Sequence, residues 1–527
     1  MMTKQNISRR EFLKAATIGS AMLPAFLMQC GSSKRPNILF IMSDDHAYQA
    51  ISCYGSRINK TPNIDRLAME GMRFGNCFVT NSLCAPSRAT ILTGKYSHVN
   101  GQIDNGVTFD GSQVTFPKLL QAAGYQTALI GKWHLESDPT GFDYWKILVG
   151  QGEYYNPVFN EMGELKNHIG YASNLITEFA LDCLDHRNRE RPICLLVHHK
   201  APHRNWMPDE RHLTLYDDIE IPLPETFYDD YLTRSHAARQ QEMTIAHHLD
   251  LPYDLKVAPE KEESLKGLEL SYFKALKRMT PKQRQVWDAA YGPKREAFRK
   301  ANLQGRELAE WKYQRFIKDY LRCVASVDDS VGRILDYLDR FGLTENTLVI
   351  YTSDNGFFLG EHGWFDKRFM YEQSLRIPLI MRYPRIIKPN NVNEDMVLNL
   401  DFAPTFLDLA GVKIPGEIQG RSLRPILQGK TPADWRQSIY YHYYEYPGPH
   451  SVKRHYGIRT RRYKLIHFYY DIEAWECYDL LNDPNEINNV YSDPACKHII
   501  DQLKAELDRL QKHYGDSEEL AKRYISQ

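Results

Sequence analysis

The sequence predicts an α/β protein with a large, mostly parallel sheet sandwiched by helices and a smaller α+β subdomain at the carboxyl end. Three observations predict it: apolar runs typical of buried strands, helical patterns between them, and aromatic-rich strands after about residue 434. Strands that alternate with helices favour a parallel sheet covered on both faces. A chain of 527 residues can bury such a core, either as one large domain with an appendage or as two ordinary domains.

The elements of the main sheet are predicted from local patterns. Apolar runs predict strands at residues 37–42, 126–130, 193–197, 347–352 and 378–383. Periodic patterns predict helices at residues 63–70, 116–123, 171–184 and 310–341. The first two helices are followed by Gly71 and Gly124, and glycine is a common helix stop. These elements define a main domain at residues 35–433.

Two segments depart from this pattern. Residues 223–308 are charged, weakly periodic and rich in proline, which indicates a helical insertion in the main domain. Residues 434–527 form the predicted C-terminal subdomain. Its expected elements are strands at 438–446 and 456–470 and a helix at 496–513.

Residues 1–30 are typical of an export signal. Four basic residues precede an apolar run, 15–28, that is too short to span a bilayer. Residues 8–14 resemble a twin-arginine signal, and residues 27–33 resemble a lipoprotein cleavage site that would leave Cys30 lipidated. The alternative is ordinary cleavage that removes Cys30. We expect an exported bacterial protein, periplasmic or at the cell surface, that contacts the membrane only through this lipid.

Charge and cysteine content narrow the function classes. Lys and Arg total 66, as do Asp and Glu, so no global field attracts nucleic acid or an anionic membrane. Any anionic ligand must therefore be recognised locally. The nine cysteines show no metal-type spacing, and their number leaves at least one without a disulfide partner.

Oxygen-bearing side chains follow two of the predicted strands. Asp44 and Asp45 follow the first strand, and Asp354 and Asn355 follow the strand that ends at residue 352. Ligands in such sheets bind at the carboxyl ends of the strands. Adjacent carboxylates repel unless a cation or proton lies between them, and an oxygen-only set selects calcium or magnesium over zinc. The alternative for the aspartates is a helix N-cap beside a solvated acid.

A third candidate is the segment from Asn81 to Thr90. Pro86 suits the first turn of a helix, which would put Cys84 at the helix N-terminus and Arg88 about one turn away. An anionic group at position 84 would then meet a positive helix end and a guanidinium. The alternative is a buried structural cysteine beside a surface arginine.

Several motifs occur in an order that resembles that of one known protein family. Cys84-x-Pro86-Ser87-Arg88 followed by Thr93-Gly94 resembles the signature of type I, formylglycine-dependent sulfatases of the alkaline phosphatase superfamily. Further matching motifs follow in the family order at residues 131–134, 200–203, 353–356 and 359–363, then at Lys367 and at residues 371–372. The resemblance covers nearly all of the mature chain. The sequence as a whole is most similar to bacterial glycan exosulfatases.

The resemblance implies the cofactors. A dedicated maturation enzyme would oxidise Cys84 to formylglycine (3-oxoalanine). One Ca²⁺ would then be held by oxygen atoms of Asp44, Asp45, the modified Cys84, Asp354 and Asn355. One hydroxyl of the hydrated aldehyde would attack sulfur, and the second would later collapse to the aldehyde and expel sulfate.

The resemblance also implies roles for the remaining site residues. Arg88, Lys132 and Lys367 would add fixed positive charge around the sulfuryl group. His134 would be the base for the collapse, and His203, possibly with Lys367, the acid that protonates the leaving alcohol.

Other polar residues near the motifs are open to several interpretations. His46, His198, His199 and His362 match no catalytic position, and a structural role is favoured over a role around the ligands or in a substrate subsite. His450, Arg454 and His455 lie on a polar stretch that either contacts the sugar or is a solvated loop.

The expected function is hydrolysis of sulfate esters of an extracellular glycan, such as a glycosaminoglycan, with 6-O-sulfated N-acetylglucosamine as the favoured unit. One alternative is a phosphate or phosphonate ester hydrolase of the same superfamily, although such enzymes usually use two metals with histidine ligands. The other is a noncatalytic lipoprotein that binds sulfated glycans.

Overall fold

The computed structural model describes residues 35–257 and 265–525. The predicted export signal and the lipid site at Cys30 lie outside the described residues. The described residues from Pro36 onward form one compact unit. Among the described helices, none is both long enough and apolar enough to cross a membrane. The eight cysteines in the described ranges are free thiols.

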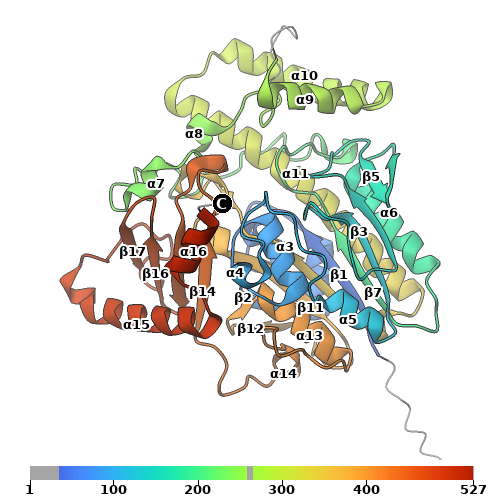
Figure 1. Ribbon diagram of the computed structural model, residues 1–527. Helices are drawn as coiled ribbons and strands as arrows, with labels where there is room; N and C mark the ends of the chain where they lie inside the picture. Colours follow the sequence, from blue (N-terminus) through green and yellow to red (C-terminus); the bar gives the residue numbers. More distant parts are fainter. Residues whose placement is uncertain (1–34, 258–264, 526–527) are drawn as a thin grey trace, which may run out of the picture. The chain divides into compact units, whose positions relative to one another are not determined.

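A mixed, mostly parallel sheet forms the centre of this unit (Figure 1). Its strand order is β12-β2-β11-β8-β1-β7-β3-β4-β5-β6, and β13 also pairs with β2. Strands β8, β1, β7, β3 and β4 run parallel, whereas β11 is antiparallel to both β8 and β2. The predicted α/β class is confirmed, and the predicted strand at 378–383 lies antiparallel within the sheet. The strands are β1 (Asn37–Ser43), β2 (Met72–Phe78), β3 (Gln126–Lys132), β4 (Tyr144–Leu148), β5 (Val158–Glu161), β6 (Glu164–Asn167), β7 (Ile193–His198), β8 (Thr347–Ser353), β11 (Arg376–Arg382), β12 (Asn391–Asn393) and β13 (Val397–Leu398).

Helices cover both faces of the sheet. Phe40 of β1 packs its ring edgewise against Phe402 and Phe406. Its neighbour Leu39 lines a small internal cavity with Leu184 and Leu338. Successive residues of a strand point to opposite faces of the sheet, so Phe40 packs against one group of helices and Leu39 against another. The first group is α3 (Cys84–Thr93), α4 (Ser97–Asn100), α5 (Phe116–Ala122), α13 (Phe402–Leu409) and α14 (Arg424–Leu427), and the second is α2 (Pro62–Met69), α6 (Ala172–Asp185) and α11 (Gly305–Arg340).

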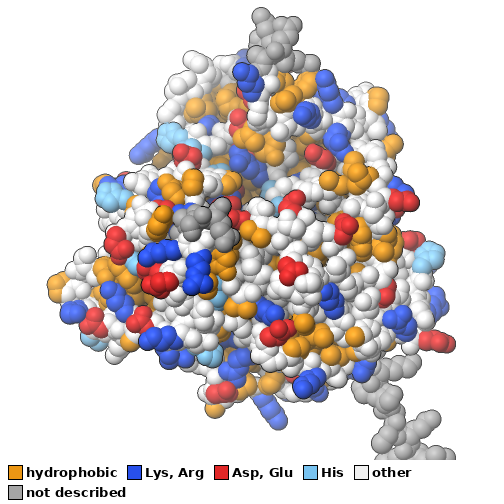
Figure 2. All heavy atoms as spheres, in the orientation of Figure 1, with side chains coloured by type: hydrophobic (Ala, Val, Ile, Leu, Met, Phe, Trp, Pro, Cys, Tyr) orange, Lys and Arg blue, Asp and Glu red, His pale blue; other side chains and the backbone are white. Residues whose placement is uncertain are grey.

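The predicted insertion is helical, as Figure 1 shows in green above the sheet. Its helices are α7 (His236–Gln240), α8 (Ile245–His248), α9 (Gly267–Arg278) and α10 (Pro281–Ala301). Helix α11 follows directly and contacts α2, α6 and α8. A short hairpin, β9 (Phe358–Leu359) and β10 (Phe365–Asp366), and helix α12 (Glu372–Leu375) follow β8. Acidic and basic side chains are interspersed on the face drawn in Figure 2.

The C-terminal part is a four-stranded antiparallel sheet with helices. The predicted strand at 456–470 is two strands that reverse at Arg461 and Arg462, and a fourth strand follows them. The strands are β14 (Ser438–Tyr443), β15 (His455–Thr460), β16 (Tyr463–Phe468) and β17 (Ala474–Asp479), and the helices are α15 (Lys497–Tyr514) and α16 (Glu518–Ile525).

Buried polar contacts join this small sheet to the main one. The carboxylate of Glu372 in α12 accepts hydrogen bonds from Arg459 at 3.0 and 3.2 Å, and Lys464 lies 3.0 Å from it. Lys464 also pairs with Glu486 at 2.6 Å, and Glu486 accepts the backbone N–H of Glu372 at 2.7 Å. Each buried charge therefore has a partner of opposite sign, which offsets the cost of desolvation.

A second junction lies beside the start of α3. The hydroxyl of Tyr441 in β14 accepts the backbone N–H of Ser82 at 3.1 Å and donates to the carbonyl of Arg368 at 2.6 Å. The small sheet thus packs directly against the segment that leads into Cys84.

Candidate active site

The sheet brings the predicted metal ligands together. β1 and β8 are parallel neighbours with Ser43 beside Ser353, so the residues that follow them share one edge. The possible ligand atoms of four side chains lie within 4.8 Å of one another, and all four residues are buried. The four are Asp44, Asp45, Cys84 and Asp354.

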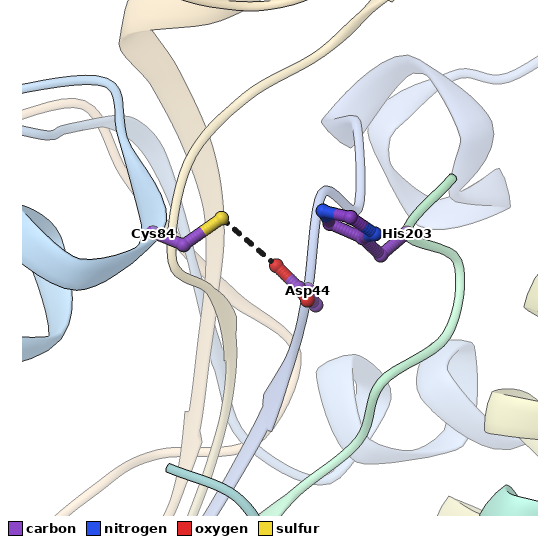
Figure 3. Close-up of side chains that lie close together, drawn as sticks. All are labelled: Asp44, Cys84 and His203. Carbon is purple, nitrogen blue, oxygen red and sulfur yellow. Dashed lines mark hydrogen bonds between the residues drawn. The ribbon is translucent and has the colours of Figure 1, made fainter. Parts of the chain in front are cut away.

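The local backbone explains this convergence. Cys84 is the first residue of α3, and its Sγ lies 3.3 Å from Asp44 Oδ1 (Figure 3). After β8 the chain turns at Gly356, where a Cβ would lie 2.2 Å from the carbonyl oxygen of Gln373. Only glycine fits there, and this close approach holds Asp354 and its neighbour at the sheet edge.

Two oxygen atoms in this cluster have no hydrogen-bond partner. Asn355 Nδ2 donates to Asp45 Oδ1 at 2.7 Å, but Asn355 Oδ1 and Asp45 Oδ2 are buried and unpartnered among the described residues. Unpaired buried oxygens are costly, and a hard cation satisfies such atoms. The donor set therefore fits calcium or magnesium.

Three cationic side chains each pair with one of the carboxylates. The pairs are Arg88 with Asp354, Lys132 with Asp44, and Lys367 with Asp45. Lys367 Nζ lies 2.5 Å from its carboxylate and 3.5 Å from the sulfur of Cys84. Three positive charges thus balance three negative ones, so a bound divalent cation would leave excess positive charge for an anionic ligand.

Burial and neighbouring charges shift the acidities. Burial raises the pKa of Asp354 to about 7, and the charge of Asp44 adds to this effect. Burial alone would raise the pKa of Asp44, but Lys132 and the other cations hold it well below its ordinary value. Burial raises the pKa of the Cys84 thiol well above its usual range, and the negative charge of Asp44 adds to this effect. Unmodified Cys84 is therefore a neutral thiol, which is a poor nucleophile.

Both predicted acid–base histidines lie at this site. His134 is buried, and burial together with the charge of Lys132 lowers its pKa to about 2. His203 is half-buried, and its Nε2 lies 3.8 Å from Asp45 Oδ2; Figure 3 shows its ring beside Asp44. Burial holds the pKa of His203 well below its usual range, and the positive charge of Lys132 adds to this effect. Both rings are therefore neutral near neutral pH.

The four neighbouring histidines have structural hydrogen bonds. Their partners are Tyr351 Oη for His46, the Lys132 carbonyl for His198, Ser330 Oγ for His199 and Asp229 for His362. Each ring is buried, which supports the structural interpretation.

Two residues of the polar stretch fit neither alternative, a sugar contact or a solvated loop. His455 is fully buried, with Nε2 accepting the N–H of Met370 at 3.1 Å. Arg454 is buried and pairs with Asp471 at 2.6 Å. His450 does reach the site, since its Nε2 lies 3.1 Å from Asp366 Oδ2, beside Lys367.

Sequence reasoning missed three polar residues of the site. Gln151 contacts both Lys132 and His134. Asp366 pairs with Arg368 and His450. Lys200 is buried over the ring of Tyr154 at 4.9 Å, and burial lowers its pKa to about 8. The signals were the glycines that flank Gln151, the position of Asp366 next to Lys367, and the matching motif at residues 200–203, which begins with Lys200.

Comparisons with known proteins find sulfatases among the relatives of this chain. A solved structure of a protein in complex with its substrate D-glucosamine-2-N,6-O-disulfate matches with a TM-score of 0.89 and 53% identity, covering 92% of this chain and 98% of that one. An N-acetylglucosamine-6-O-sulfatase of Bacteroides thetaiotaomicron is 52% identical over 511 residues, which are 96% of this chain and 91% of the relative. Human N-acetylglucosamine-6-sulfatase is 28% identical over 438 residues, 78% of this chain and 68% of the relative.

Two family models also match the chain. The model of the N-sulphoglucosamine sulphohydrolase C-terminal region matches residues 360–513. The sulfatase model matches residues 36–412, which contain every predicted metal ligand, cation and histidine of the site. The chain therefore belongs to the sulfatase family and is a sulfuric ester hydrolase.

Proposed function

We propose that this sulfatase removes the 6-O-sulfate from glucosamine units, N-acetylated or N-sulfated, of an extracellular sulfated glycan. The observation that carries the proposal is the buried, charge-balanced cluster around Cys84, in a chain 52% identical to an N-acetylglucosamine-6-O-sulfatase. The relative of known structure binds a glucosamine carrying both N- and 6-O-sulfate, which supports the same sugar class here.

The residues present fit one Ca²⁺ and a formylglycine at position 84. Three carboxylates surround the site together with the amide of Asn355, and one oxygen of Asp45 and the amide oxygen of Asn355 lack hydrogen bonds among the described residues. Calcium would hold and polarise the sulfuryl oxygens, and the hydrated aldehyde would supply an oxygen nucleophile. The high pKa of the Cys84 thiol also favours a nucleophile other than the thiolate.

The chain's own residues would orient the ester and stabilise charge. The guanidinium of Arg88 is fixed by two bonds to Asp354, at 2.9 and 3.0 Å, and Lys132 and Lys367 are fixed by Asp44 and Asp45. These positions are set before the ester binds, so charge that develops on sulfuryl oxygens is met without reorganisation.

We assign the contacts with the reacting oxygens to the two histidines. His203 is half-buried and lies beside Asp45, which suits a contact with the leaving alcohol at the edge of the cluster. Its neutral ring must take up a proton before it can act as the acid. His134 is deeper and adjoins Lys132. We assign it to the oxygen of residue 84.

A panel of defined monosaccharides tests this proposal. We expect sulfate release from N-acetylglucosamine 6-sulfate and N-sulfoglucosamine 6-sulfate, and much slower release from the 3-sulfate and from galactosamine 6-sulfate. Preferential hydrolysis of the 6-phosphate would instead support a phosphate ester hydrolase. Mass spectrometry of the peptide that contains Cys84 should show the thiol replaced by an aldehyde, and the variant Cys84→Ala should bind calcium but release no sulfate.

Export and lipidation belong to the same proposal. The twin-arginine-like segment at 8–14 and the cleavage-like segment at 27–33 support an exported protein anchored through Cys30. Metabolic labelling with a fatty acid, compared between the natural chain and Cys30→Ser, tests the anchor. Label retained by the variant would exclude Cys30 as its site.

A further inference from the structure

An exposed glutamine joins two buried residues of the site. Gln151 Oε1 lies 2.5 Å from Lys132 Nζ, and Gln151 Nε2 lies 2.8 Å from His134 Nε2. Lys132 is fully buried and His134 nearly so, whereas Gln151 is exposed. The glutamine therefore reaches inward from the surface, and its amide end lies between two groups that would act on the substrate.

The amide can have only one orientation. Lys132 carries hydrogen-bond donors and no acceptor, so the atom of Gln151 that faces it must be the carbonyl oxygen. The amide nitrogen then faces His134 and donates a proton to His134 Nε2. The imidazole is neutral, because burial and Lys132 hold its pKa far below neutrality. A neutral ring that accepts at Nε2 carries its own proton on Nδ1.

Two glycines shape the loop that holds Gln151 in this position. Gly150 and Gly152 flank it with φ values of 55° and 73°, and a Cβ on Gly152 would lie 2.6 Å from a side-chain carbon of Leu148. Two residues further on, the hydroxyl of Tyr154 donates to the carbonyl of His203 at 2.5 Å. One loop thus contacts both candidate acid–base histidines.

We propose that Gln151 is a positioning residue that fixes His134 as the tautomer with its proton on Nδ1. The Nδ1 atom is buried and has no partner among the described residues, so it is the nitrogen left to meet an oxygen of residue 84 or of the ester. In this tautomer His134 can donate a hydrogen bond from Nδ1 but cannot remove a proton there, so this inference replaces the role of base that the family resemblance implied. The inference rests on the proposed function for its catalytic meaning, but the tautomer is a property of the protein alone.

The test is nuclear magnetic resonance of the mature, calcium-loaded protein labelled with ¹⁵N-histidine. The His134 signals are assigned by their loss in His134→Asn. Gln151→Glu keeps the shape but offers only acceptors, so it should favour the proton on Nε2, and Gln151→Met should leave a mixture. Gln428→Ala, an exposed glutamine at the end of α14, is the matched control and should retain the Nδ1 proton.

Kinetics of the same variants add a second readout. We expect kcat of Gln151→Glu and Gln151→Met to fall about 10- to 100-fold, the usual cost of losing an outer hydrogen bond, with KM little changed. A proton on Nε2 in the natural protein, or the same tautomer in every variant, would overturn the proposal. A rise in KM alone would do so too, since it would make Gln151 a substrate contact. If the tautomers behave as expected but no glucosamine 6-sulfate is hydrolysed, the proposed function fails and this inference stands.

Discussion

Arg88 and Asp354 form a buried pair in which Nε and Nη2 of the arginine both donate to one carboxylate oxygen, at 3.0 and 2.9 Å. The side chains are 2% and 0% exposed, so neither charge has water as a substitute partner. The same guanidinium also donates to the Lys132 carbonyl at 2.8 Å. Arg88 thereby links the end of β3 to the residues that follow β8.

This pair yields the first prediction. Arg88→Lys keeps a positive charge but loses the second donor, and we expect kcat to fall about 10²- to 10³-fold, as when one preorganised donor is removed from an oxyanion site. Arg88→Ala leaves Asp354 unpaired and should destabilise the fold by about 3 to 5 kcal/mol. Steady-state kinetics and urea unfolding measure the two effects. An Arg88→Lys enzyme with natural kcat would contradict a catalytic role for the guanidinium.

The proposed calcium site predicts that calcium stabilises the folded chain, by an amount that grows with the logarithm of the calcium concentration. An ion that binds the native cluster and not the unfolded chain raises the melting temperature, so this temperature should rise with calcium and fall when a chelator is added. In Asp45→Asn this shift should be much smaller. Asp229→Asn, at a half-buried acid paired with Arg234 and His362 instead, is the control and should keep the full shift. A chelator that changes neither melting temperature nor activity would argue against a metal site.

Asp328 should make stability depend on pH. Its carboxylate accepts the backbone N–H groups of Asn63 and Ile64 at the start of α2, yet burial raises its pKa to about 6 from an ordinary 3.8. A raised folded-state pKa means that the protonated form stabilises the fold below about pH 4, and that this contribution is lost as pH rises through 6. The loss is on the order of 3 kcal/mol.

Asp328→Asn cannot ionise, so it isolates this effect. Relative to the natural chain, we expect the variant to gain free energy of unfolding as the pH rises from about 4 to 8, by urea denaturation. Gln304→Ala, at an exposed position that does not ionise, just before α11, is the control, and its free energy of unfolding should differ from that of the natural chain by the same amount at every pH. Parallel pH profiles for Asp328→Asn and the natural chain would show that Asp328 does not titrate in this range.

The junction between the two sheets gives a coupling prediction. Removing Arg459 leaves Glu372 with only Lys464, so Arg459→Ala should destabilise the fold by about 3 to 5 kcal/mol. The double variant Arg459→Ala, Glu372→Ala should be less destabilised than the sum of the single variants. Additive losses would mean that the two side chains do not interact.

The sequence predicted which residues meet at the sheet edge, because they follow strands with clear apolar runs. Asp44 follows a strand that is buried except at its first residue, and Asp354 follows one that is buried throughout. β2 was missed because Gly75 and Asn76 interrupt its pattern. The hairpin of β15 and β16 was predicted as one strand, since Arg461 and Arg462 turn the chain without glycine or proline.

Contacts across the fold were beyond local patterns. Nothing near Gln151 indicates that it meets Lys132, because the two residues are brought together by the parallel pairing of β3 with β4 and the loop that follows. In the same way, His455 resembled a loop residue available to a sugar, but strand pairing with β14 and β16 buries it. Tertiary packing, not propensity, decides such positions.

The hydrogen bond from the Ser82 backbone N–H to the Tyr441 hydroxyl has a consequence for biosynthesis. Cys84 is 1% exposed, and the last strand-bearing part of the chain closes over the residues just before it. An enzyme that oxidises this thiol would have to reach it before the carboxyl-terminal part of the chain has docked. Maturation and folding would then run in a fixed order, and a chain that closes too early would remain permanently inactive.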